Sequence, residues 1–123
     1  MEAAIRASRE FDLVYLHLEA IDECSHLGDL KLKLRAIEEF DSRIVGPVLE
    51  ALKDERDFNF AILPDHPVPI KLRKHTTTPV PVAMCGTSFS ADGITRFSET
   101  DAPHGALGFM SGGEIVRKVL ALD

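Results

Sequence analysis

Histidines and aspartates occur at three places in the sequence where apolar residues give way to polar ones. Asp22 and His26 are four positions apart and follow the first apolar segment. Asp65 and His66 are neighbours after a second apolar segment, and His75 precedes a third. Neutral imidazoles and carboxylates are ligands for divalent metals, at about 2.0–2.2 Å. These residues therefore predict metal coordination.

Each Asp/His pair has a local geometry that favours a shared target. A spacing of four brings Asp22 and His26 to one side of a helical turn. Asp65 and His66 would point to opposite faces of a regular strand, but the flanking prolines of the Pro-Asp-His-Pro run hold the backbone irregular, so both side chains can converge. Either pair alone is more common on an ordinary surface than at a metal. Their recurrence at successive segment ends favours the metal.

Other histidines and the cysteines are expected to have different roles. His17 lies inside the first apolar segment, where a core or ligand-supporting imidazole is expected, and His104 lies in a loop, where exposure is expected. Cys24 and Cys85 are far apart in a sequence without a Cys-x-x-Cys pair. That spacing predicts two reduced thiols and neither a disulfide framework nor a zinc knuckle.

Three apolar segments are predicted to be strands. They occupy 11–20, 58–63 and 80–86. The first is nearly continuous in its apolar residues, which is typical of a central parallel strand buried on both faces. Pro79 and Pro81 each remove a hydrogen-bond donor from the third strand.

A helical pattern separates the first two of these strands. An apolar stripe predicts a helix from about 29 to 53, with a bend where Gly46 and Pro47 interrupt it. The strand and helix order indicates an α/β layer fold, in which ligands bind beyond the carboxyl ends of strands. Two further short helices are expected at 2–10 and 115–120, and a long polar loop is expected at 86–113.

Composition limits the class of protein. The chain has 123 residues, 45% of them hydrophobic, and a formal net charge of −6. Those values suit one small domain or part of one, and exclude disorder. Apolar runs far shorter than the ~20 residues of a spanning helix, with no signal peptide, predict a cytoplasmic protein and no membrane partner. An acidic chain without a basic stripe argues against nucleic acid as the main partner.

One basic cluster stands beside the predicted metal ligands. Lys71, Arg73 and Lys74 directly precede His75. Cations next to metal ligands suit a phosphate-bearing ligand. A solvated basic loop is the alternative, because charge runs usually face water.

Two long segments resemble a known family. They are VYLHLEAIDECSHLGDLKLKLRAIEEFDSRIVGPVLEAL and LPDHPVPIKLRKHTTTPVPVAMCG. They closely resemble the C-terminal part of archaeal-type cofactor-independent phosphoglycerate mutases, members of the alkaline phosphatase superfamily, and the resemblance runs from about Phe11 to Leu122. The combination of D-x-x-x-H-x-G-D, D-H-P and H-T-x-x-P-V-P is specific, whereas one motif alone is not. These motifs correspond to Asp22, His26, Gly28 and Asp29, to Asp65, His66 and Pro67, and to His75, Thr76, Pro79, Val80 and Pro81.

The resemblance implies a fold and a ligand set. The chain, 1–123, would be the C-terminal segment of the metal-binding, phosphatase-like domain: part of an alkaline-phosphatase-like three-layer α/β sandwich with a mostly parallel sheet, truncated at the N-terminus. Asp22, His26 and His75 would hold one divalent ion, and Asp65 and His66 would contribute to a second. The family uses manganese, magnesium or zinc. Ser25 stands where the family usually has Gly.

The resemblance also implies what the chain lacks. In the family, an Asp ligand and a nucleophilic Ser follow an N-terminal strand, which cannot fit before Phe11. Ser8 lies in a helix-forming run, and Thr76 to Thr78 follow a ligand, so neither is accepted as the nucleophile. The nucleophile is expected upstream of this chain, which makes the missing N-terminal segment an expected partner. An unpaired sheet edge would also favour homo-oligomers.

The implied function of the full-length protein is metal-dependent interconversion of 2-phosphoglycerate and 3-phosphoglycerate in glycolysis. This chain would supply most metal ligands but no nucleophile, and is predicted to be inactive alone. The alternatives are another phosphoryl-transfer enzyme of the superfamily, or a non-catalytic metal-binding fragment. A plain α/β domain with unligated histidines would show no thermal shift with manganese or zinc.

Overall fold

The computed structural model describes residues 2–122, which divide into two units. The first unit contains the described residues up to Asp54 together with Pro67–Thr77. The second contains Glu55–His66 together with the described residues from Thr78 onward. No helix within 2–122 is long and apolar enough to cross a membrane.

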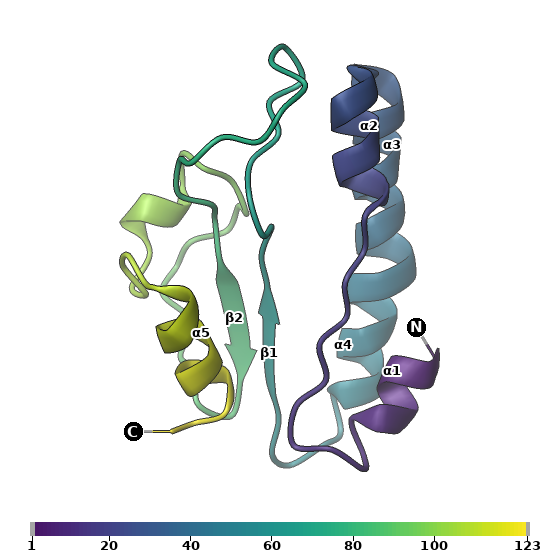
Figure 1. Ribbon diagram of the computed structural model, residues 1–123. Helices are drawn as coiled ribbons and strands as arrows, with labels where there is room; N and C mark the ends of the chain where they lie inside the picture. Colours follow the sequence, from purple (N-terminus) through teal and green to yellow (C-terminus); the bar gives the residue numbers. More distant parts are fainter. Residues whose placement is uncertain (1, 123) are drawn as a thin grey trace. The chain divides into compact units, whose positions relative to one another are not determined.

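The first unit is helical. Its elements are α1 (Glu2–Ala7), α2 (Ala20–Leu27), α3 (Leu30–Phe40), the π-helical turn η1 (Asp41–Val45) and α4 (Gly46–Leu52). Helices α2 and α3 lie side by side, joined by a very short turn (Figure 1). Gly28 ends α2 in a left-handed conformation at φ 73°, and the Asp29 carboxylate begins α3 by accepting a hydrogen bond from the Leu32 N–H at 2.9 Å.

The long predicted helix is present, interrupted by a π-helical turn directly before the predicted Gly-Pro pair. Helix α3, η1 and α4 follow one another without a break. At η1 the Gly46 N–H donates to the carbonyl of Asp41, five residues earlier, which is the π-helical pattern. Pro47 has no N–H to continue the regular ladder. The irregularity therefore occurs at the predicted Gly-Pro pair, as a π turn.

The predicted first strand is wrong for the structure described here. Residues 13–19 form neither helix nor strand. Strands need a neighbouring backbone to pair with, and no segment within 2–122 pairs with this one. Its apolar side chains are consequently exposed: Tyr15 retains 78% of its accessible surface. The core position predicted for His17 is also wrong, because His17 is exposed and stacks on Tyr15 with ring centroids 6.2 Å apart.

The second unit contains the sheet. Strands β1 (Asn59–Ile62) and β2 (Ala83–Gly86) fall inside the predicted second and third strands, with β2 beginning after Pro81. They pair antiparallel, with Asn59 opposite Gly86 and Ile62 opposite Ala83. The predicted mostly parallel sheet is therefore wrong for the described residues. No helix lies between β1 and β2 in the chain, and a parallel pair needs such a crossover.

Short elements complete the second unit. The predicted long loop is present and holds only the 3₁₀ turn η2 (Ala102–His104), whose His104 is exposed as expected. Helix α5 (Gly112–Val119) confirms the predicted last helix and begins with a capping box between Ser111 and Glu114. The Asn59 side chain donates to the Val119 carbonyl at 3.0 Å, which ties α5 to β1.

Few side chains are fully buried. Cys24, Ser25 and Val68, all in the first unit, are at most 6% exposed. Both cysteines are free, as predicted; Cys85 is exposed as a residue, and partial desolvation of its thiol raises the pKa. Many large apolar residues stay exposed. On α3 these are Leu30, Leu32, Leu34 and Ile37.

Candidate metal centre

Three of the predicted ligands come together in the first unit. Asp22 and His26 project from successive turns of α2, and His75 comes from the loop at 67–77. The Nε2 atoms of His26 and His75 are 3.1 Å apart. Asp22 places Oδ2 3.4 Å from the His26 Nε2 and Oδ1 3.7 Å from the His75 Nε2. One donor atom from each residue lies within 4.8 Å of the others.

These separations suit a shared metal ion. Two ligands at about 2.1 Å from one ion are about 3.0 Å apart at a right angle and about 3.4 Å apart at a tetrahedral angle. The three measured separations, 3.1, 3.4 and 3.7 Å, lie close to that range. The side chains of Asp22, His26 and His75 are 31%, 37% and 54% exposed, so a ligand can approach from solvent. A carboxylate with two imidazoles fits zinc and manganese.

A backbone carbonyl sets the proton position of His26. The Nδ1 atom of His26 lies 2.9 Å from the carbonyl oxygen of Arg73. A carbonyl oxygen only accepts hydrogen bonds, so Nδ1 must carry the proton. In the neutral ring Nε2 then carries the lone pair, which faces the His75 Nε2 at hydrogen-bond distance. That tautomer is the one a metal ligand needs.

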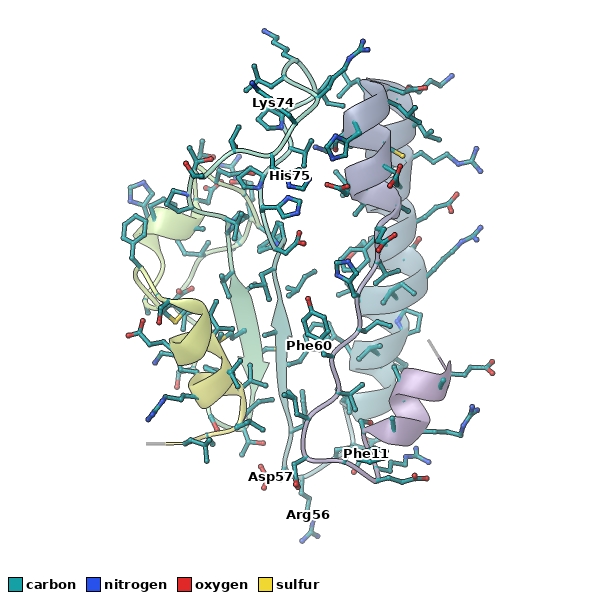
Figure 2. The ribbon with its side chains drawn as sticks, in the orientation of Figure 1. Phe11, Arg56, Asp57, Phe60, Lys74 and His75 are labelled. Carbon is teal, nitrogen blue, oxygen red and sulfur yellow. The ribbon has the colours of Figure 1, made fainter. Side chains whose placement is uncertain are left out.

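The loop carrying His75 is closed on itself and fastened to α3. The Thr76 N–H donates to the Pro67 carbonyl at 3.0 Å, which brings the two ends of the loop together. The Lys33 ammonium on α3 donates to the carbonyl of the buried Val68 at 3.0 Å. Figure 2 shows Lys74 and His75 on this loop. The loop that carries His75 is therefore held by the hydrogen bond between its two ends and by the contact of Lys33 with Val68.

The end of α2 is fitted closely to the same loop. A Cβ placed on Gly28 would lie 2.2 Å from Nε of Arg73, so the Arg73 side chain occupies the space that a larger residue would fill. Gly28 also has a left-handed φ of 73°, which other residues adopt at a cost. The left-handed φ is the reason that position 28 needs glycine, whereas the flexible end of the Arg73 side chain could move away from a Cβ. His26 is two residues away and receives its carbonyl contact from the same arginine.

Ser25 is accommodated without disturbing the ligands. Its hydroxyl donates to the Ile21 carbonyl at 2.7 Å, one turn earlier, and the residue is 1% exposed. Because this bond is made within α2, the hydroxyl is satisfied inside the helix. Cys24 beside it is buried and reduced. The departure from the family pattern therefore leaves Asp22 and His26 on the same helical face.

Asp65 and His66 belong to the second unit and converge on each other. The His66 Nε2 lies 3.2 Å from Oδ2 of Asp65, and the His66 N–H donates to Oδ1 at 3.0 Å. The neighbouring side chains therefore do turn toward the same point, as the irregular backbone between Pro64 and Pro67 predicted. Their part in a second metal site stays a prediction.

Ser8 shows no sign of being an activated nucleophile. The Ser8 hydroxyl donates to the Ile5 carbonyl within its own turn, at 2.9 Å.

The basic cluster of Lys71, Arg73 and Lys74 is exposed, as the solvated-loop alternative predicts. Its binding of a phosphate-bearing ligand stays a prediction.

Lys33, Gly28 and the backbone of Arg73 support the site and were not predicted to do so. The Gly-Asp pair after His26 is a typical helix end followed by a helix start, so the role of Gly28 had a signal in the sequence. Lys33 had no such signal, because in the sequence it looks like any charged residue on a solvated helix face. Arg73 adopts a φ of 54°, which no sequence pattern predicts for arginine.

A helix and a loop thus bring together a carboxylate and two imidazoles, a group of side chains that could hold a metal ion. The family profile of the Metalloenzyme superfamily matches residues 1–116. The chain belongs to this superfamily.

Within it, the chain is similar to proteins named 2,3-bisphosphoglycerate-independent phosphoglycerate mutase. The protein of that name from Methanothrix thermoacetophila is 43% identical over 98% of this chain and 31% of its own length. The one from Methanosarcina acetivorans is 41% identical over 93% of this chain and 29% of its own. The resemblance to these mutases is confirmed.

A solved structure agrees. The structure of PH0037 protein from Pyrococcus horikoshii matches 98% of this chain with a TM-score of 0.91 and 32% identity, and the match covers 36% of that protein. The chain thus spans about a third of each of these relatives.

Proposed function

We propose that the full-length protein interconverts 2-phosphoglycerate and 3-phosphoglycerate, a step of glycolysis, with the help of divalent ions. Membership of the Metalloenzyme superfamily and the names of its relatives support the reaction. The observation that carries the proposal is the grouping of Asp22, His26 and His75, with donor atoms within 4.8 Å. A plain α/β domain has no need of this grouping.

The five predicted ligands divide into two sets. Asp22, His26 and His75 would hold one ion, and Asp65 with His66 would contribute to a second, the metal being manganese, magnesium or zinc. Bound divalent ions supply positive charge that offsets the charge on a transferring phosphoryl group. The carboxylate of Asp22 offers the negative charge that retains a cation, and His26 has Nδ1 against the Arg73 carbonyl and Nε2 as its remaining donor. The chain's own part is to hold these donors in place.

The nucleophile would come from outside this chain. The chain spans 31% of the Methanothrix relative, so most of such an enzyme lies elsewhere. In this proposal 1–123 is the C-terminal segment of a three-layer sandwich whose other strands pair with the backbone at 13–19. Those strands would cover apolar side chains such as Leu13 and Tyr15, which are exposed here. The isolated chain would be inactive, yet able to bind one ion.

A different phosphoryl-transfer reaction is the alternative, because metal ligands are shared across such a superfamily. A non-catalytic metal-binding fragment is the second. Both keep the Asp22, His26 and His75 centre. They differ in what happens to a phosphoglycerate in the full-length protein.

The test compares the full-length protein and the chain alone, each supplied with manganese and 3-phosphoglycerate. Full-length protein should form 2-phosphoglycerate without releasing phosphate, and the chain alone should not. His26→Ala in the full-length protein should lower turnover by about 100-fold or more, since removing a metal ligand forfeits several kcal/mol of charge stabilisation. Release of free phosphate by the full-length protein would favour a phosphatase. Turnover by the chain alone would contradict the missing nucleophile.

A further inference from the structure

We propose that Arg73 is a positioning residue: its backbone, held in a left-handed conformation, fixes His26 in the tautomer that presents Nε2 to a cation. This inference rests on the metal centre of the proposed function. It adds that the backbone of Arg73 orients the metal ligand His26 before any ion binds.

The hydrogen bond between His26 and Arg73 is the first step of the argument. His26 Nδ1 and the Arg73 carbonyl oxygen are 2.9 Å apart, from residues 47 positions apart in sequence. A free imidazole exchanges its proton between Nδ1 and Nε2, and only one arrangement leaves Nε2 open. A fixed carbonyl at Nδ1 selects that arrangement. It also restricts rotation of the ring, so Nε2 keeps its direction toward His75.

The backbone conformation of Arg73 delivers that carbonyl. Arg73 has φ 54°, and the other non-glycine residue with positive φ in the described part of the chain is Ala121. The Arg73 N–H donates to the Pro69 carbonyl at 2.9 Å, closing a tight turn just before His75. A return to ordinary negative φ would redirect the peptide that follows, and the Arg73 carbonyl would leave His26. Strain of this kind persists where surrounding structure determines it.

The Arg73 side chain provides a second attachment to α2. Its Nε, Cζ and Nη2 lie 2.2, 2.6 and 2.8 Å from the position of a Cβ on Gly28. One residue therefore contacts α2 twice, with its carbonyl at His26 and its guanidinium stem against Gly28. Glycine at position 73 would permit the same φ but would lack this packing. That contact explains how an arginine is kept in a conformation that most side chains avoid.

Two substitutions separate the backbone from the side chain. Arg73→Asn and Arg73→Val both remove the guanidinium, but Asn tolerates left-handed φ and a β-branched Val does not. In Arg73→Val, the affinity of the 123-residue chain for manganese and for zinc, measured by calorimetry, should fall about 10- to 100-fold. Losses of this size follow removal of other contacts that orient metal ligands. Arg73→Asn should lose less than about 10-fold. Equal losses in the two variants would overturn the proposal, since the guanidinium would then be responsible.

A metal-free measurement tests the tautomer directly. Nitrogen-15 NMR of the His26 ring in the full chain should show a protonated Nδ1 and an unprotonated Nε2 in wild type and in Arg73→Asn. Arg73→Val should shift the ring toward the Nε2-protonated form, with circular dichroism confirming that the helices remain. An Nε2-protonated His26 in wild type would overturn the proposal without any variant. If the tautomers are as expected but wild type binds no ion, the positioning stands and the proposed function fails.

Discussion

The Nε2 atoms of His26 and His75 lie 3.1 Å apart although 49 positions separate these residues in the sequence. His26 cannot donate from Nε2, because its proton is held at Nδ1 by the Arg73 carbonyl. Two imidazole lone pairs directed at one point repel, so the short distance requires either a proton on the His75 Nε2 or a cation between the rings. Asp22, within 3.7 Å of both Nε2 atoms, adds negative charge at that point. With a proton on the His75 Nε2 the contact is an ordinary hydrogen bond, and the same three residues could also hold a metal ion.

Removal of either imidazole should abolish tight metal binding. His26→Ala and His75→Ala each delete one of three donors, and manganese or zinc affinity should fall by more than about 100-fold, beyond the range for ligand-supporting contacts. Isothermal titration of the chain measures the loss. His104→Ala, in the exposed turn η2, is the control and should bind as wild type does. Unchanged affinity in both ligand variants would remove the metal centre.

The grouping of Asp22 with His26 could be predicted because its signal is local. Asp22 and His26 are one helical turn apart, and a helix places such residues on one face wherever it packs. His75 was joined to them by its place beside an apolar segment, which the structure bears out. The helix irregularity next to Gly46 and Pro47 was predictable for the same reason, since proline acts on its own turn.

Features that depend on absent or distant neighbours could not be predicted. The apolar run at 11–20 has a strand pattern, but forming a strand requires a partner that residues 2–122 do not supply. An alternating apolar and polar pattern predicts a strand, but it does not say whether β1 and β2 pair parallel or antiparallel. The left-handed Arg73 results from tertiary contacts with Gly28 and His26. Sequence periodicity carries none of this information.

Lys33 should stabilise the loop that carries His75. Lys33→Met removes the ammonium that donates to the Val68 carbonyl while keeping the aliphatic stem. The free energy of unfolding should fall by about 1 kcal/mol, because the lost bond is charge-assisted but only partly buried. Urea unfolding measures it. Lys31→Met, an exposed neighbour on α3, should change the free energy by less than about 0.5 kcal/mol. Equal effects of the two substitutions would mean that the Val68 contact contributes nothing.

Gly28→Ala should affect both stability and metal binding. Left-handed φ at a non-glycine residue costs about 1–2 kcal/mol, and the new Cβ would displace the Arg73 side chain. Gly108→Ala is the matched control, with φ 64° and no atom within 4 Å of a Cβ. Both should lose stability in thermal unfolding, but only Gly28→Ala should weaken manganese binding. Weaker binding in Gly108→Ala as well would show that general destabilisation explains the effect.

Asp92 should make the stability of the second unit depend on pH. The Ala106 and Ile94 N–H groups donate to its carboxylate, and these bonds hold the pKa of Asp92 below its usual range. A lowered folded-state pKa stabilises the fold fully above the unfolded value of about 3.9, and this contribution is lost as pH falls through the folded value. Asp92→Asn should therefore melt earlier than wild type at pH 7, with the difference narrowing below about pH 4. Asp12→Asn, at an exposed aspartate of the first unit, is the control. A constant difference at all pH values would exclude ionisation as the cause.

The chain alone should bind one divalent ion, not two. Asp22, His26 and His75 supply three donors, whereas Asp65 and His66 supply two, which are already hydrogen-bonded to each other. Two donors hold an ion weakly, so calorimetry with zinc should give one tight site per chain, and His66→Ala should leave its affinity unchanged. In the full-length protein, where further ligands are proposed, the same His66→Ala should reduce two bound ions to one. Two tight ions on the chain alone would show that Asp65 and His66 complete a site without the rest of the protein.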